Sequence, residues 1–141
     1  MTRPAPPTGA TPPAQVLTAE GVAIELGPLA REICRRYHQE FTDEEERYGP
    51  AGREWCLHDN QYLLAWAIQD ARDGTVRLDE QAVWLAGVLE ARNFPAARLA
   101  RDLEIAGDVV LTSHVLGALA KPTSEIFADA AAAVSALRQI P

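Results

Sequence analysis

The stretch EWCLHDNQYLLAWAIQDA, residues 54–71, decides the fold class. Its second half, from Tyr62 to Ile68, is apolar on every side of a helix, which is typical of a helix surrounded by other helices. Its first half is polar at four consecutive positions, His58 to Gln61. The stretch therefore predicts a helix that begins near Gly52, becomes fully buried toward its end, and stops at Asp73-Gly74.

Apolar residues continue at helical spacing on both sides of this stretch. They predict a helix from Pro28 to about Tyr48, and three later helices, from Asp79 to about Arg92, from Pro95 to about Leu119, and from Thr123 or Ser124 through Leu137. No segment alternates between apolar and polar residues at period two. The sequence thus predicts an all-α fold, an antiparallel bundle of four to five helices without a sheet.

The first 20 residues differ in composition from the rest of the chain. They contain five prolines among Thr, Ala and Gly, namely Pro4, Pro6, Pro7, Pro12 and Pro13. Such a segment forms few regular backbone hydrogen bonds and buries little surface, so residues 1–20 are predicted to be a disordered tail. Residues 21–141 are predicted to form one helical domain. With no signal-like apolar run and no membrane-length apolar stretch, the expected location is the cytoplasm.

The charge balance indicates which partners to expect. The chain carries 20 acidic and 13 basic residues, a net charge of -7. An acidic surface repels nucleic acid and anionic lipid, so neither nucleic acid nor membrane is an expected partner, which leaves a small molecule or a protein. A single lysine, Lys121, beside twelve arginines indicates a bacterial genome rich in G and C.

Cysteine and histidine together raise the question of a zinc site. Cys34 and Cys56 are accompanied by His38 and His58. If the hairpin turned near residue 50, Cys56 would lie level with Glu45, ~16 Å along the helix from Cys34 at ~1.5 Å per residue. This distance would exclude both shared zinc ligation and an intramolecular disulfide. The sequence therefore predicts no metal site and two ordinary buried thiols.

The same register places His38 near Leu63, within reach of Asp59 and Tyr62. A histidine oriented by a carboxylate and a phenol could act as a base, a pH sensor or an axial ligand. It could equally be a hydrogen-bonded interior residue that fixes the pairing of two helices. Aromatic residues nearby could form a pocket for a flat ligand or pack the core. The candidate ligand-binding residues are Tyr37, His38, His58, Asp59, Tyr62 and Trp66.

Several catalytic signatures are missing from the sequence. It has no Glu-x-x-His pair for a dinuclear centre, no nucleophile elbow and no glycine-rich phosphate loop. The favoured function is a non-enzymatic helical sensor or interaction module that binds a small ligand or a partner protein. Two alternatives stay open: a small cofactor-dependent or acid–base enzyme that uses His38, Asp59 and Tyr62, and a structural domain that forms a homodimer. No particular cofactor is indicated.

The segment YGPAGREWCLHDNQYLLAW, residues 48–66, resembles a pattern found in uncharacterised bacterial helical domains. The matching positions are Tyr48, Gly49, Gly52, Arg53, Cys56, Asp59, Tyr62 and Leu63. The later segment NFPAARLARDLEIAGDVV, residues 93–110, is similar to the last long helix of that family. The resemblance implies a sensory or regulatory module, with no activity attached to it. Gln61-Tyr62 is a departure, since the family pattern has Tyr-His there.

Overall fold

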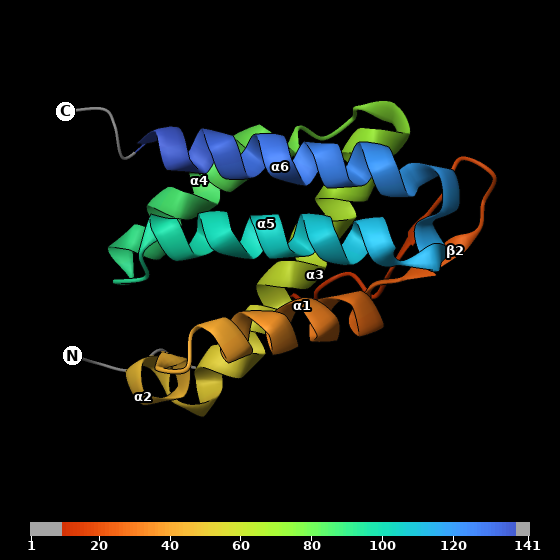
Figure 1. Ribbon diagram of the computed structural model, residues 1–141. Coiled ribbons are helices and arrows are strands. Elements are labelled where there is room, and N and C mark those ends of the chain that lie inside the picture. Colours follow the sequence, from red (N-terminus) through yellow and green to blue (C-terminus); the bar gives the residue numbers. More distant parts are fainter. Residues whose placement is uncertain (1–9, 138–141) are drawn as a thin grey trace.

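The computed structural model of the chain describes residues 10–137 (Figure 1). Two short strands come first, and helices account for most of the remainder. The elements are β1 (Gln15–Leu17), β2 (Ala23–Glu25), α1 (Leu26–Glu40), α2 (Glu44–Tyr48), α3 (Pro50–Asp73), α4 (Leu78–Ala91), α5 (Ala96–Thr112), the 3-10 helix η1 (His114–Leu119) and α6 (Ala120–Ala136). The predicted all-α character is confirmed in this coarse form, while the simple bundle of four to five helices is not.

The helices pack around the core from several sides. α5 and α6 run antiparallel and side by side, and α4 packs against α6 (Figure 1). α1 lies along the other side of α5, and α3 crosses behind these helices and contacts both α1 and α6. The middle of α3 is therefore enclosed, and its residues Leu63, Leu64, Ala67 and Ile68 are at most 1% exposed. This explains why its second half is apolar on every side.

The first helix ends eight residues earlier than predicted. α1 ends at Glu40, Phe41 leaves the helical conformation, and a separate helix α2 begins at Glu44. The acidic run from Asp43 to Glu46, expected at the end of one long helix, instead lies at the start of α2. Negative side chains at a helix N-terminus are stabilised by the helix dipole, whereas at a C-terminus they are destabilised. The new boundary thus places these charges favourably.

α3 ends where the sequence predicts and begins at Pro50, slightly before the predicted start near Gly52. Gly49 adopts a positive φ of 70° and Pro50 occupies the first turn, where its missing N–H is not needed. At the other end Gly74 is left-handed, with φ 70°, and its N–H donates to the carbonyl oxygens of Gln69 and Asp70. These two ends fix the helix that contributes more residues to the wall of the cavity described below than any other element.

The last two helices divide differently from the prediction. α5 ends at Thr112 rather than near Leu119, and η1 follows it, with Gly117 at φ 54°. α6 begins at Ala120, so Pro122 lies in its first turn instead of interrupting the chain. A proline so near a helix start costs little, because the first N–H groups of a helix have no partner within the helix.

A small hairpin corrects two predictions at the N-terminal end. β1 and β2 pair antiparallel, with Val16 opposite Ile24, although no sheet was predicted. Residues 15–17 belong to this hairpin and not to a disordered tail, and the first nine residues of the predicted tail lie outside the described residues. The strands have three residues each, too few for an alternating pattern to stand out in the sequence. Burial of Val16 and Ile24 against the helices stabilises them.

Neighbouring residues of β1 provide a direct test of this hairpin. Val16 is 6% exposed and Leu17 is 52% exposed. Val16→Asp should lower the free energy of unfolding by at least about 2 kcal/mol, because it buries a charge among apolar side chains. Leu17→Asp should change it by less than about 0.5 kcal/mol, as expected for a surface position. Urea melts of both variants check this, and equal, small effects would show that β1 does not pack on the core.

Among the described residues, no single helix is both long enough and apolar enough to cross a membrane. α5 together with the segment His114–Ala136 meets the length and composition requirement only as a pair bent by 113°.

Candidate functional site

A partly open cavity of about 90 Å³ lies between the first half of α3 and parts of α1, α2, α4 and α5. Its walls are mainly aromatic and aliphatic, and its remaining residues come from α2, α3, α5 and the α4–α5 connection. The aromatic and aliphatic residues are Tyr37, Tyr48, Trp55, Phe94, Leu63, Leu89 and Leu99. The remaining lining residues are Glu44, Gly52, Cys56, Asp59, Asn60, Arg92 and Asp102. An apolar pocket with few polar groups is the common form of a small-molecule site.

The central polar group of the cavity is a pair formed by Asn60 of α3 and Asp102 of α5. Asn60 is 2% exposed and Asp102 is 6% exposed. Asn60 Nδ2 donates to Asp102 Oδ1 at 3.1 Å and to the Cys56 carbonyl oxygen at 2.9 Å. Within residues 10–137, Asn60 Oδ1 is buried and accepts no hydrogen bond. An unsatisfied buried acceptor costs free energy.

Burial changes the protonation of Asp102. Removal from water raises its pKa to about 7, and the negative charges of Asp59 and Glu44 act in the same direction. The hydrogen bond from Asn60 opposes this increase but does not cancel it. Near neutral pH both forms of the carboxyl are therefore populated. It can donate a hydrogen bond when protonated and only accept when ionised.

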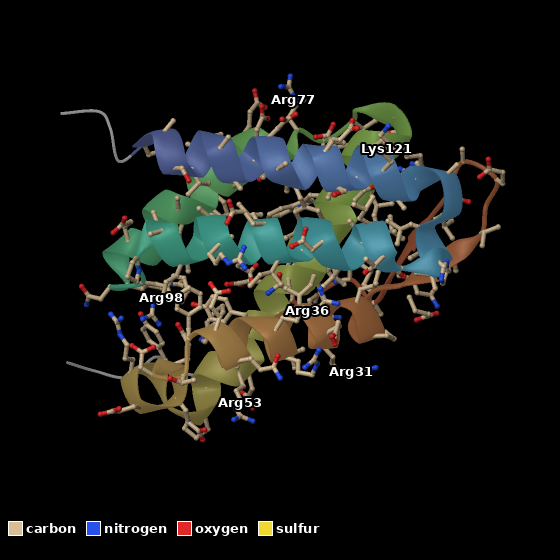
Figure 2. The ribbon with its side chains drawn as sticks, viewed as in Figure 1. Arg31, Arg36, Arg53, Arg77, Arg98 and Lys121 are labelled. Atoms are coloured by element: carbon tan, nitrogen blue, oxygen red, sulfur yellow. The ribbon has the colours of Figure 1, made fainter. Side chains whose placement is uncertain are left out.

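A second buried acid, Glu44, holds α2 in place. Tyr37 Oη donates to Glu44 Oε1 at 2.6 Å, and Arg98 Nη1 donates to the same oxygen at 2.6 Å. Arg98 also reaches Asp43 at 2.9 Å and lies over the ring of Phe41. Figure 2 shows Arg98 at the end of α5 nearest α2. One arginine thus joins α5 to the turn between α1 and α2, and this contact shapes one wall of the cavity.

Tyr37 acts in this network as a neutral donor. Burial, followed by the hydrogen bond to Glu44, raises its pKa far above the usual range for a phenol. The Tyr37 hydroxyl therefore keeps its proton at physiological pH and donates a hydrogen bond to the Glu44 carboxylate.

The structure separates the predicted cluster of His38, Asp59 and Tyr62. His38 Nδ1 donates to the carbonyl oxygen of Cys34, one turn earlier in its own helix, at 2.7 Å. Asp59 instead pairs with its sequence neighbour His58, whose Nδ1 donates at 3.0 Å. The predicted contact of His38 with Asp59 and Tyr62 is therefore wrong. The prediction assumed that the first two helices form a simple hairpin that turns near residue 50. In the structure, the turn after Glu40 and the helix α2 lie between α1 and α3.

The other predicted residues fall into two groups. Tyr37 and Asp59 line the cavity. His58, Tyr62 and Trp66 form a half-buried aromatic row along α3 with Trp55, in which successive ring centroids lie 5.1–5.7 Å apart. Asp59 also contacts the aromatic row, through its hydrogen bond with His58. Burial raises the pKa of Asp59, and the nearby His58 opposes the increase. Whether any of these six residues binds a ligand stays a prediction.

The predicted 16 Å separation of the cysteines is also wrong. Asn60 Nδ2 lies 3.7 Å from Cys34 Sγ and 3.5 Å from Cys56 Sγ, so both thiols contact the same amide group. The neighbouring Cys34 thiol, followed by burial, raises the pKa of Cys56. The earlier turn and the inserted helix α2 shift α3 relative to α1. Both thiols are reduced in this structure, Cys34 buried and Cys56 half-buried.

Sequence reasoning missed the residues that matter most to the cavity: Asn60, Asp102 and Glu44. One of them left a visible signal. Asp102 interrupts the apolar stripe formed by Leu99, Leu103 and Ala106, at a position where a buried residue is expected. A charged residue in such a stripe is rarely buried without a partner.

Comparison with protein families, with curated proteins and with solved structures finds no match to this chain.

Proposed function

We propose that the protein is a non-enzymatic helical sensor or interaction module that binds a small ligand in the cavity between α3 and α5. The observation behind this proposal is the unsatisfied Oδ1 of Asn60 beside the buried carboxyl of Asp102. Both residues line an otherwise mostly apolar cavity. A ligand that fills the cavity would replace an unpaired acceptor with a hydrogen bond and bury apolar surface at the same time.

The chemistry of the lining favours a small ring that carries an N–H or O–H donor. Tyr48, Trp55 and Phe94 offer aromatic faces and edges for a ring. Asn60 Oδ1 can only accept a hydrogen bond, and Asp102 accepts one when ionised. The carboxyl groups of Asp59 and Asp102 further disfavour an anion. A ring that cannot donate would leave the Asn60 acceptor unsatisfied.

Binding of phenol, aniline and toluene, three single rings of similar size, tests this proposal by NMR titration. Phenol and aniline should bind saturably and shift the signals of Asn60 and the Trp55 indole. Toluene should bind roughly fivefold more weakly, since one hydrogen bond contributes about 1 kcal/mol. If none of the three binds saturably up to millimolar concentration, or if toluene binds as well as phenol, the proposal is wrong.

Two tryptophan substitutions on α4 serve as matched variants for this titration. Leu89→Trp adds a large ring at a residue that lines the cavity and should abolish binding. Gly87→Trp adds the same ring to the same helix at an exposed position with open space around it, and should leave binding unchanged. Binding that survives Leu89→Trp would place the site elsewhere.

An acid–base enzyme is the alternative with an observation behind it, namely the pKa of about 7 at Asp102. A group with such a pKa can both accept and donate a proton near neutral pH. Here Asp102, rather than His38, would be the reacting group. Chemical conversion of a bound ring during the titration, lost in Asp102→Asn, would favour this alternative over simple binding.

A further inference from the structure

We propose that Cys34 and Cys56 form a reversible intramolecular disulfide, and that this pair is a redox site on the wall of the cavity. The proposal is independent of ligand binding. It starts from a placement that the sequence did not predict: thiols from two helices, α1 and α3, meet side by side.

The geometry that supports a disulfide comes from one amide group. Asn60 Nδ2 lies 3.7 Å from Cys34 Sγ and 3.5 Å from Cys56 Sγ, so the two sulfurs are at most about 7 Å apart. From this shared contact the two sulfurs must approach each other further to reach the S–S bond length of about 2 Å.

The two thiols differ in their access to an oxidant. Cys56 lines the partly open cavity and is half-buried, whereas Cys34 is buried at 6% exposed. A molecule as small as hydrogen peroxide can enter a cavity of about 90 Å³ and meet Cys56 first. Cys56 is thus the thiol that an oxidant reaches first, and Cys34 is the residue that resolves the product. The raised pKa of Cys56 makes the first step slow, because only the small thiolate fraction reacts.

The chemistry proceeds in two steps with hydrogen peroxide as the oxidant. The Cys56 thiolate attacks one peroxide oxygen, the O–O bond breaks, and the leaving oxygen departs as water after taking up a proton. Cys56 is now a sulfenic acid. The Cys34 sulfur then attacks the Cys56 sulfur, the S–O bond breaks, and a second water leaves. A dithiol reductant returns two electrons and two protons and restores both thiols.

Disulfide formation would also alter the cavity. Asn60 Nδ2 contacts both sulfurs while it donates to Asp102. Formation of the S–S bond would move both sulfurs relative to the Asn60 amide. The bond would also link α1 to α3 covalently, between residues 34 and 56. The redox state of the pair would therefore change the surroundings of the Asn60 and Asp102 side chains.

The wild-type chain itself allows a clear test, because it has only two cysteines. The full chain is equilibrated with mixtures of reduced and oxidised glutathione, quenched with acid, and analysed by intact mass. The same series is run in 6 M guanidinium chloride. We expect the intramolecular disulfide to form in the folded protein at roughly a hundredfold lower oxidising strength than in the unfolded chain, because folding holds the thiols together. The proposal is overturned if the folded protein needs equal or stronger oxidising conditions than the unfolded chain to form the disulfide. It is also overturned if glutathione adducts accumulate and the intramolecular disulfide does not form.

Single-cysteine variants test the order of the two steps. In Cys34→Ser treated with hydrogen peroxide, the Cys56 sulfenic acid cannot be resolved and should be trapped by dimedone. In Cys56→Ser the buried Cys34 should give at least tenfold less of the adduct, since susceptibility follows exposure. The reverse pattern would contradict the proposed roles. The glutathione measurement on the wild-type chain decides the proposal even if a variant fails to fold.

Discussion

Arg98→Met is expected to lower the free energy of unfolding by at least about 3 kcal/mol, because it leaves the Glu44 carboxylate buried without its cation. Glu44 is 5% exposed, and its Oε1 accepts from both Arg98 and Tyr37 at 2.6 Å. Methionine keeps much of the length and apolar surface of arginine, so the decrease in the free energy of unfolding reports mainly the removal of the positive charge. Urea melts at pH 7 and low salt measure it.

The control for Arg98 is the double variant Glu44→Gln with Arg98→Met. Removal of both charges should recover at least about 1 kcal/mol relative to Arg98→Met alone, since no uncompensated charge is then buried. Arg53→Met is the matched surface control, because Arg53 pairs with Glu45 in an exposed position, and it should cost less than about 1 kcal/mol. If Arg98→Met proves as mild as Arg53→Met, Arg98 is not holding α2 in place.

Asp102→Asn is expected to make the protein more stable than the wild type at pH 8, and about equally stable at pH 4. The pKa of Asp102 is about 7 in the folded protein, against 3.8 for an unperturbed aspartate. The folded state therefore binds its proton more tightly than the unfolded state. The stability from this group is fully present below pH 4 and is lost as pH rises through 7. Three pKa units correspond to about 4 kcal/mol, which is the upper limit of the effect.

The difference in free energy of unfolding between the wild type and Asp102→Asn isolates the titration of Asp102 from that of the other carboxyl groups. Ion-paired carboxylates such as Glu40 and Asp43 have lowered pKa values, so they add stability as pH rises and oppose the Asp102 effect. Urea melts of wild type and Asp102→Asn should be compared at each pH from 4 to 8. Asparagine keeps an acceptor for Asn60, so packing changes little. A difference that does not grow with pH would mean that Asp102 is ionised throughout.

Long helices with a clear apolar pattern could be predicted from the sequence. Burial of one side of α5 leaves apolar residues at a period of 3.6 over several turns, whereas α3 is recognised by its continuous apolar run. The hairpin of β1 and β2 could not be predicted this way. Its strands are three residues long, and each contributes a single buried residue, Val16 or Ile24.

The break between α1 and α2 depends on contacts that are distant in the sequence. The helix dipole changes the stability of each acidic side chain by only a few tenths of a kcal/mol, too little to decide between two readings of the run from Asp43 to Glu46. The bonds that decide it come from Arg98, 54 residues after Glu44. Because the prediction missed the turn between α1 and α2, it placed the residues of α3 opposite the wrong residues of α1. The predicted contacts of His38 and the predicted cysteine separation were wrong for this reason.

Of the six candidate binding residues, Tyr37 and Asp59 line the cavity, and ligand binding by any of the six stays a prediction. The pairing of Asn60 with Asp102 requires α5 to lie against the first half of α3. No local pattern in the sequence determines how those two helices meet.

The short helix α2 also has a consequence for the rate at which molecules enter the cavity. Two of its residues, Glu44 and Tyr48, belong to the wall. A helix of five residues is not stable in water by itself, so its lifetime is set by the side chains that hold it, chiefly Tyr37 and Arg98. If α2 must open for entry, this opening step is the same for every occupant. Ligands of very different affinity would then share one association rate and differ only in residence time.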